Sequence, residues 1–135
     1  MSVQRSATIR GSIVCVFAFV SQIERLAAWD DTIVSTRRLS DAPTEVGTRF
    51  EQHIATDRGS ARADAVVIAY EPPHRFDWLR DLHGEREITR ITLERTGEAT
   101  LVRIRRQPAG PAFDIALETR RLDSSLRRLG ELLER

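Results

Sequence analysis

The chain contains no lysine and only one cysteine, Cys15, among its 135 residues. A single cysteine excludes an internal disulfide and a metal site built from several thiolates. Cys15 lies within an apolar run, so we expect a buried and unreactive thiol. The sequence also lacks a glycine-rich phosphate loop, a nucleophile elbow and a Cys–His arrangement. The familiar signatures of nucleotide binding and nucleophilic catalysis are therefore missing.

Charge of one dominant sign is also absent. The chain carries 21 arginines against 20 acidic residues, which gives a net charge of +1. Arginine pairs stand at positions 37–38, 105–106, 120–121 and 127–128. Acidic residues alternate with these pairs, so we interpret them as solvated faces rather than a nucleic-acid footprint. No nucleic-acid partner is expected.

The histidines and neighbouring acids do not form a metal or cofactor pattern. His53 falls on the polar face of a predicted strand, while His74 and His83 fall in predicted turns. Three scattered histidines predict no metal site, and no cofactor is expected. Asp30 and Asp31 could be a carboxylate pair for acid–base chemistry, but we favour the charged start of a loop.

The apolar run Ile13–Val20 follows two arginines, as the core of a signal peptide would. Eight residues cannot span a bilayer, and no small-residue cleavage site follows them. We therefore expect a folded segment of a cytoplasmic protein with no membrane insertion. Periodicity alone leaves this run open to a helix or a strand.

Most of the chain shows the alternation of β-strands. Phe50, Gln52 and Ile54 share one face of a predicted strand whose other face is polar, and the later segments repeat this period of two. A two-proline corner, Pro72-Pro73, separates two of the strands. The predicted strands include 3–10, 61–70, 75–82, 86–94 and 99–106, with two more between residues 33 and 54. Short turns between them predict an antiparallel meander.

A long helix is predicted at the end of the chain. Leu122, Leu126, Leu129 and Leu133 recur at steps of four, three and four, which makes one apolar stripe. That stripe must pack on the concave face of the sheet. The sequence thus predicts one domain, 1–135, of the α+β class, in which a strongly curved antiparallel sheet of six to seven strands grips the helix.

Several motifs together resemble a known family. They are Val16-Phe17-Ala18-Phe19-Val20 followed by Trp29, Val46-Gly47-Thr48-Arg49-Phe50, the corner Tyr70 to Phe76, and Leu129 to Leu133. In this order they resemble the polyketide cyclase/dehydrase branch of the START-like, helix-grip superfamily (SRPBCC). The helical spacing of Phe17, Val20, Ile23 and Leu26 suggests one or two short helices after the first strand, and the resemblance implies that residues 13–20 are helical. It also implies an internal pocket for an apolar small molecule between the sheet and the C-terminal helix.

The resemblance and the strand alternation together suggest which side chains would line such a pocket. The candidates are Trp29, Phe50, Tyr70, Phe76, Trp78, Ile91, Phe113 and Leu117. Each of them could instead be ordinary core, because aromatic residues make up only 6% of the chain and most are needed for folding. Tyr70 and Trp78 carry polar groups as well as apolar bodies, so they are the better candidates for orienting a ligand.

Two functions of different classes follow from the resemblance. The first is binding of a hydrophobic small molecule, such as a lipid, quinone or polyketide-like compound. The second is a cyclase or aromatase, a cyclase/dehydrase-like lyase, that acts on a bound poly-ketone. The catalytic candidates for this second function are Tyr70 and Arg80, both weak. Arg80 lies on the same strand face as Phe76 and Trp78 by alternation, but we favour a solvated strand end for it. Binding is preferred, because inward polar groups look scarce and two or more near each other would be needed for catalysis. A protein-interaction module and a homodimer are also compatible with the sequence.

Overall fold

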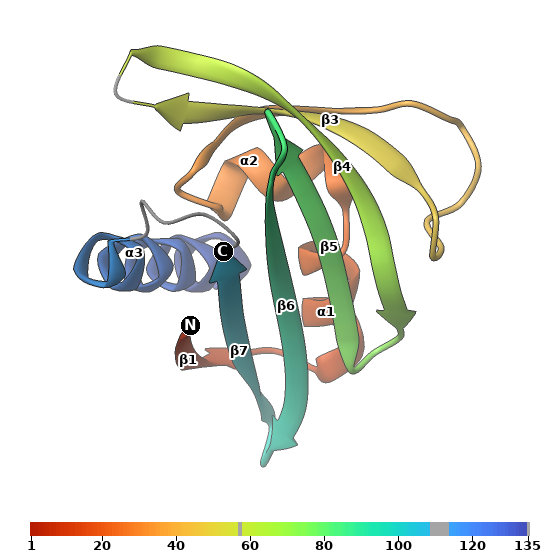
Figure 1. Ribbon diagram of the computed structural model, residues 1–135. Coiled ribbons are helices and arrows are strands. Elements are labelled where there is room, and N and C mark those ends of the chain that lie inside the picture. The colour runs from red at the N-terminus through yellow and green to blue at the C-terminus, as the bar shows by residue number, and fades with distance from the viewer. Residues whose placement is uncertain (57, 109–113, 135) are drawn as a thin grey trace.

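The structure is a computed structural model that describes residues 1–56, 58–108 and 114–134. Within these residues the chain forms a mixed fold of strands and helices (Figure 1). The strands are β1 (Val3–Arg10), β2 (Ile33–Arg38), β3 (Arg49–Thr56), β4 (Gly59–Glu71), β5 (Arg75–Leu82), β6 (Glu85–Thr96) and β7 (Ala99–Pro108). The helices are α1 (Ile13–Val20), the 3₁₀ turn η1 (Ile23–Arg25), α2 (Leu26–Trp29) and α3 (Ile115–Leu133).

The strands of the described residues form one antiparallel sheet in the order β1-β7-β6-β5-β4-β3-β2. The sheet curves strongly, so that β3 and the beginning of β4 cross over the top of the molecule in Figure 1. Helix α3 packs on β1 and α2, while α1 packs on β6 and β7. This arrangement confirms the predicted α+β class, the curved meander and the two short helices after the first strand. Residues 13–20 are helical, as the resemblance implied.

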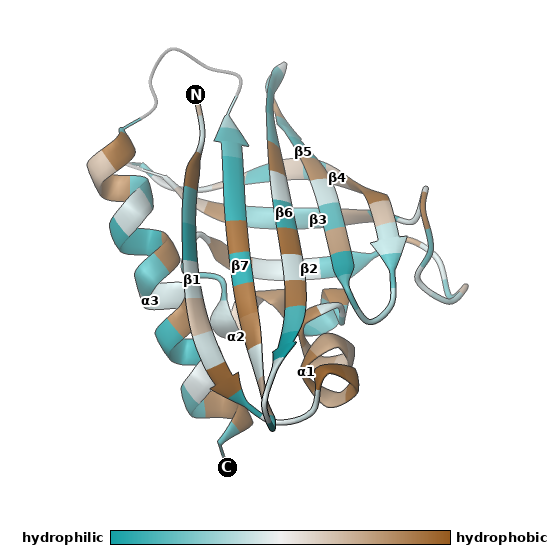
Figure 2. Cartoon of the chain, turned by 90° about the horizontal axis from the view of Figure 1, so that it is seen from below, coloured by the Kyte–Doolittle hydropathy of each residue, from teal (hydrophilic) through white to brown (hydrophobic). Residues whose placement is uncertain are grey.

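The apolar stripe of α3 packs on the concave side of the sheet. Leu122, Leu126 and Leu129 are buried, and Leu133 lies partly buried at the end of the helix. The helix begins at an Asp114 cap, whose carboxylate accepts a hydrogen bond from the Leu117 backbone N–H. Figure 2 shows α3 running beside β1, with brown and teal residues alternating along the helix.

The prediction of a buried Cys15 is wrong, because the thiol is exposed. The residues of α1 that the core covers are Ile13, Val16, Phe17 and Val20, at helical steps of three, one and three. Cys15 falls on the opposite side of this helix, where Val14 is also exposed. An apolar run that is hydrophobic all round, as α1 is in Figure 2, does not reveal its buried face from composition alone.

A fully buried ion pair joins the end of α2 to β7. One oxygen of Asp30, Oδ2, accepts a hydrogen bond of 2.8 Å from Nη2 of Arg106. The other, Oδ1, accepts from the backbone N–H and the hydroxyl of Thr32. Burial alone would raise the pKa of the Asp30 carboxyl, but Arg106 and the Thr32 hydrogen bonds lower it below its ordinary value. Asp30 does begin the loop after α2, as predicted, but its carboxylate is fully buried. The interpretation of Arg106 as solvated is wrong, because its side chain is buried as well.

Replacing Asp30 by asparagine should remove this counter-charge and lower the free energy of unfolding at pH 7 by about 3 kcal/mol. The folded-state pKa of Asp30 lies below its unfolded value, so its stabilising contribution is present above the unfolded pKa, near about 4. That contribution is lost as the pH falls through the folded pKa. Urea unfolding at pH 7, 5, 4 and 3 should therefore show wild type losing more stability on acidification than Asp30→Asn. Parallel losses in the two proteins would contradict the assignment.

Replacing Leu129 by alanine should destabilise the fold by about 2–5 kcal/mol, because it empties a fully buried contact between α3 and the sheet. The matched control is Leu133→Ala on the same helix, where the side chain is only partly buried and the loss should be clearly smaller. Thermal or urea unfolding of the two variants measures the difference. Equal losses would show that the stripe is not what holds α3 to the sheet.

Candidate functional site

The concave face changes from apolar to polar along β5 and β6. The register pairs Phe76 with Ile91, then Trp78 with Thr89, then Arg80 with Glu87. Phe76, Trp78 and Ile91 are fully buried, and Arg80 is only 6% exposed. Because alternate residues of a strand share one face, these pairs line the same wall. An aromatic surface therefore leads directly to a charged one inside the molecule.

The guanidinium of Arg106 is the centre of the charged end. Arg106 pairs with Thr89 across β7 and β6, and its Nε donates to the Thr89 hydroxyl at 3.2 Å. The same Nε lies 3.3 Å from Glu87 Oε1, and Nη1 lies 3.6 Å from Glu118 Oε2 on α3. Burial would lower the pKa of Arg106, but Asp30 and these two carboxylates raise it above its ordinary value.

A second arginine lies beside the first. Arg80 donates from Nη2 to Glu87 Oε1 and from Nη1 to Gln52 Oε1, the latter at 3.3 Å. Burial lowers the pKa of the Arg80 guanidinium despite the charge of Glu87. Our preference for a solvated strand end is thus wrong. Its register partner on β4 is the small Ala65, and the carboxylate of Glu87 opposite offsets the cost of burying the charge.

These polar side chains form one group, which we call the interior cluster. Its members are Asp30, Gln52, Arg80, Glu87, Arg106 and Glu118. With every group ionised, two arginines and three carboxylates leave a formal charge of −1. The expectation that inward polar groups are scarce is therefore wrong. The condition set above for catalysis, two or more inward titratable groups near each other, is met.

Several buried polar atoms on this wall and on the elements packed around it have no hydrogen-bond partner in the described part of the chain. Four are donors and one is an acceptor: Nε1 of Trp29, Nε1 of Trp78, Nε2 of Gln52, Nη1 of Arg106, and Oε2 of Glu118. A buried polar atom without a partner costs about 1–3 kcal/mol. Most such atoms in folded proteins are paired, so an accumulation around one wall points to a site that binds something.

The structure locates most of the predicted lining residues. Trp29, Phe50, Phe76, Trp78 and Ile91 are fully buried. Tyr70 is partly buried and contacts the rings of Phe17 and Phe76, with centroid separations of 5.8 and 6.3 Å. Leu117 is half-buried in the first turn of α3, and Phe113 lies outside the described residues. Tyr70 therefore belongs to the aromatic end of the wall and is not part of the interior cluster.

Simple periodicity carried a signal for several residues that our sequence prediction missed. Gln52 shares its face with Phe50 and Ile54, and Arg106 shares its face with Val102 and Ile104. Glu118 precedes Leu122 by four residues, which places it on the buried stripe of α3. What periodicity did not provide is the partner of each charge, since the nearest carboxylate to Arg106 comes from Asp30, 76 positions away in sequence.

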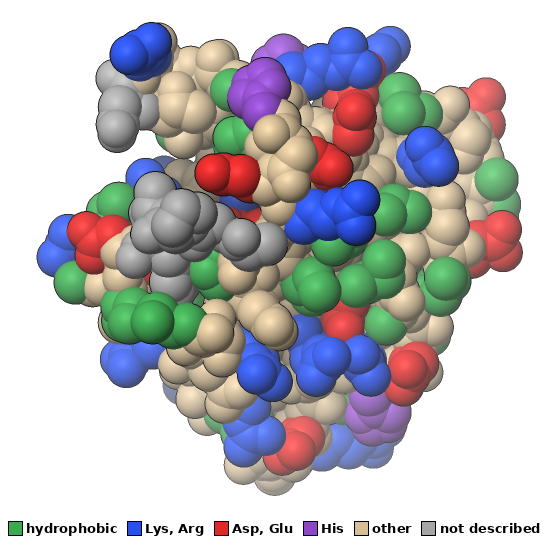
Figure 3. Space-filling view, in the orientation of Figure 1, with side chains coloured by type: hydrophobic (Ala, Val, Ile, Leu, Met, Phe, Trp, Pro, Cys, Tyr) green, Lys and Arg blue, Asp and Glu red, His purple; other side chains and the backbone are tan. Residues whose placement is uncertain are grey.

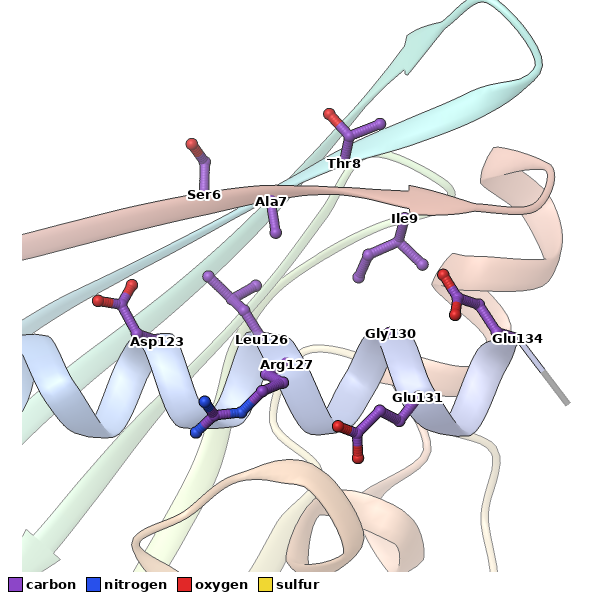
Figure 4. A pocket seen from close by; sticks show the side chains of 10 residues that line it. All are labelled: Ser6, Ala7, Thr8, Ile9, Asp123, Leu126, Arg127, Gly130, Glu131 and Glu134. Atoms are coloured by element: carbon purple, nitrogen blue, oxygen red, sulfur yellow. The ribbon is translucent and has the colours of Figure 1, made fainter.

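A surface groove of about 390 Å³ lies between β1 and α3 (Figure 4). Ala7 and Ile9 point from β1 toward the helix, where Gly130 contributes no side chain. Asp123, Glu131 and Glu134 lie along the groove with Arg127. The unpaired buried atoms described above do not line this groove, so we assign the candidate site to the interior cluster.

Two further searches of the described residues were negative. No three His, Cys, Asp or Glu side chains come together in a way that could hold a metal ion. No helix described here has both the length and the apolar character needed to cross a bilayer. On the face of the molecule seen in Figure 3, basic, acidic and apolar side chains are intermixed.

Comparisons with known proteins agree with this fold. The sequence model of a family described as "Polyketide cyclase / dehydrase and lipid transport" matches residues 1–134. No curated protein matches the chain. Among solved structures, protein MLL2253 from Mesorhizobium loti is similar, with a TM-score of 0.77, 20% identity and coverage of 99% of this chain and 97% of that chain.

Two further solved structures are similar to this chain. One is the di-domain ARO/CYC StfQ from the steffimycin biosynthetic pathway, with a TM-score of 0.77 and 20% identity. The similarity covers 98% of this chain and 44% of StfQ. The other is major latex-like protein 151 from Panax ginseng, with a TM-score of 0.77, 13% identity and coverage of 98% and 97%.

The family match spans nearly the whole chain, and the curved seven-stranded sheet with its C-terminal helix is the helix-grip arrangement that the sequence motifs suggested. The chain therefore belongs to the polyketide cyclase/dehydrase and lipid transport family.

Proposed function

We propose that this protein binds a small molecule with an apolar, aromatic body and oxygen atoms at one end, between the concave face of the sheet and α3. The observation that carries the proposal is the set of unpaired buried polar atoms on Trp29, Trp78, Gln52, Arg106 and Glu118. A ligand whose oxygens accept from the four donors and whose O–H donates to Glu118 would supply hydrogen bonds that the described part of the chain does not provide. Family membership and the similarity to StfQ support the same class of ligand.

The two ends of the wall explain how such a ligand would be held. The rings of Phe76 and Trp78 are tilted by 50° with centroids 5.6 Å apart, and together they offer an apolar surface for a ring system. Beyond Trp78, the side chains of Arg80 and Arg106 present charged donors that hydrogen-bond strongly to carbonyl or hydroxyl oxygens. Burial of the apolar body would supply about 25 cal/mol per Å² of affinity, and the cluster would set the orientation.

The test is a titration with 1,8-dihydroxyanthraquinone, a flat aromatic probe that carries hydroxyl and carbonyl oxygens. The chain has two tryptophans, both fully buried: Trp78 lies on the proposed wall, and Trp29 ends α2 next to Asp30 of the interior cluster, so binding should quench their emission. Gln52→Leu removes an unpaired donor and should weaken binding about tenfold. The matched control is His53→Leu, the next residue along β3, whose side chain is exposed and faces outward.

Native mass spectrometry of freshly purified protein offers an independent check, because a bound apolar compound would add its mass to the 15.3 kDa chain. Unchanged tryptophan emission together with bare protein mass would contradict the proposal. Equal weakening by Gln52→Leu and His53→Leu would show that the probe binds outside the sheet rather than at the interior cluster.

The five titratable side chains of the interior cluster favour a second candidate function. This function is catalysis of enolisation, a step that a cyclase or dehydratase requires. A carboxylate beside a bound ketone could remove a proton from the carbon next to the carbonyl. A nearby guanidinium would stabilise the enolate oxygen that forms. We assign these roles to Glu118 Oε2 and Arg106 Nη1, which lie 3.6 Å apart.

Deuterium exchange into the methyl group of 2-acetylnaphthalene, followed by mass spectrometry in D₂O, measures this chemistry without a known substrate. Wild type should accelerate exchange over buffer, and Glu118→Gln should return the rate to the buffer value because the base is lost. Glu131→Gln, an exposed acid on the same helix, is the control and should retain the wild-type rate. Binding of this ketone without faster exchange would leave a carrier or sensor and reject the enzyme.

Two sequence predictions extend this proposal beyond the site. We propose a cytoplasmic protein, on the absence of a cleavage site after the apolar run and on the packing of that run as helix α1 in the core. We also propose that the ligand, rather than a nucleic acid, is the partner, since the net charge is only +1.

A further inference from the structure

We infer that Arg106 and Glu118 together recognise a hydroxyl group on the ligand, so that the site selects phenols or enols over ethers and unsubstituted aromatics of the same shape. The inference rests on the proposed function and adds to it the chemical group of the ligand that the site recognises. It depends on the one place in the interior cluster where an unpaired donor lies next to an unpaired acceptor.

The two atoms are Nη1 of Arg106 and Oε2 of Glu118, which lie 3.6 Å apart. Both are buried, and neither has a hydrogen-bond partner in the described part of the chain. At this separation they do not hydrogen-bond well to each other, because N–H···O bonds cluster between about 2.7 and 3.2 Å. They are nevertheless close enough for one ligand oxygen to contact both.

The remaining atoms of both side chains are held by other partners. Nη2 and Nε of Arg106 donate to Asp30 and Thr89, and Oε1 of Glu118 accepts from Nη1 of Arg121 at 3.2 Å. Glu118 is 8% exposed and Arg106 is 1% exposed, so neither can turn far toward solvent. The donor and the acceptor are therefore presented in fixed positions before a ligand arrives.

A hydroxyl is the group that fits this pair best. Its oxygen can accept from the guanidinium while its O–H donates to the carboxylate, which satisfies both atoms at once. A ketone or ether oxygen can accept but not donate, so Oε2 of Glu118 would stay unpaired. An ammonium group can donate but not accept, so it would leave Nη1 unpaired and lie against the charge of Arg106. An anionic oxygen would face the Glu118 carboxylate.

The test compares 2-naphthol with 2-methoxynaphthalene, two probes of nearly equal shape of which only the first carries an O–H. Tryptophan quenching gives both affinities in the same protein. Wild type should bind 2-naphthol about tenfold or more tightly than the methyl ether, since a hydrogen bond to a charged group is worth at least that ratio. Glu118→Leu removes the acceptor and should bring the two affinities to within about twofold.

Matched variants separate recognition from folding. Glu131→Leu makes the same substitution at an exposed position of α3 and should keep the wild-type preference. Glu118→Gln keeps a weaker, neutral acceptor and should show an intermediate preference. Binding of the methyl ether should be unchanged or tighter in Glu118→Leu, which shows that the interior of that variant is intact.

The outcomes distinguish the inference from the proposed function. Equal affinity of wild type for the two probes would overturn hydroxyl recognition while leaving an apolar binding site in place. A preference for 2-naphthol that survives in Glu118→Leu would also overturn it, because another group would then read the hydroxyl. Failure of both probes to bind would reject the proposed function for aromatic ligands, and the inference with it.

Discussion

The burial of one guanidinium organises this molecule. Arg106 projects from β7 into the interior, and its nitrogens reach Asp30 at the end of α2, Thr89 and Glu87 on β6, and Glu118 on α3. An isolated buried charge would be very costly, so each of these segments must take up its position for the arginine to be tolerated. The same side chain thus holds the helices against the sheet and shapes the candidate site.

The interior cluster shows a trade between stability and binding. A core built for stability alone would pair every buried polar atom or replace it by an apolar one. Here Nη1 of Arg106 has no hydrogen-bond partner among the residues that the structure describes, and neither do donors on two tryptophans and one glutamine. Such an arrangement is retained more readily where a ligand completes it, because function commonly opposes optimal stability.

A local irregularity of the sheet also shapes the aromatic end of the wall. The register between β4 and β5 shifts between Val67 and Ala69, so one extra residue is inserted in β4. Strict alternation from Val67 would turn Tyr70 to the outer face, whereas the bulge returns it to the rings of Phe17 and Phe76. Which face a residue takes beyond a bulge cannot be obtained by counting in twos.

The sequence by itself determined the class of fold and nearly every strand and helix, because periods of two and 3.6 depend only on local geometry and on having a core. Strand Arg75–Leu82 and the leucine stripe of α3 are examples. Only the tertiary structure decided which charges are buried and with which partners. In the sequence, Asp30 and Arg106 look like ordinary surface residues. The curved sheet brings these two positions, 76 apart, into contact, and their pairing offsets the free-energy cost of burying both charges.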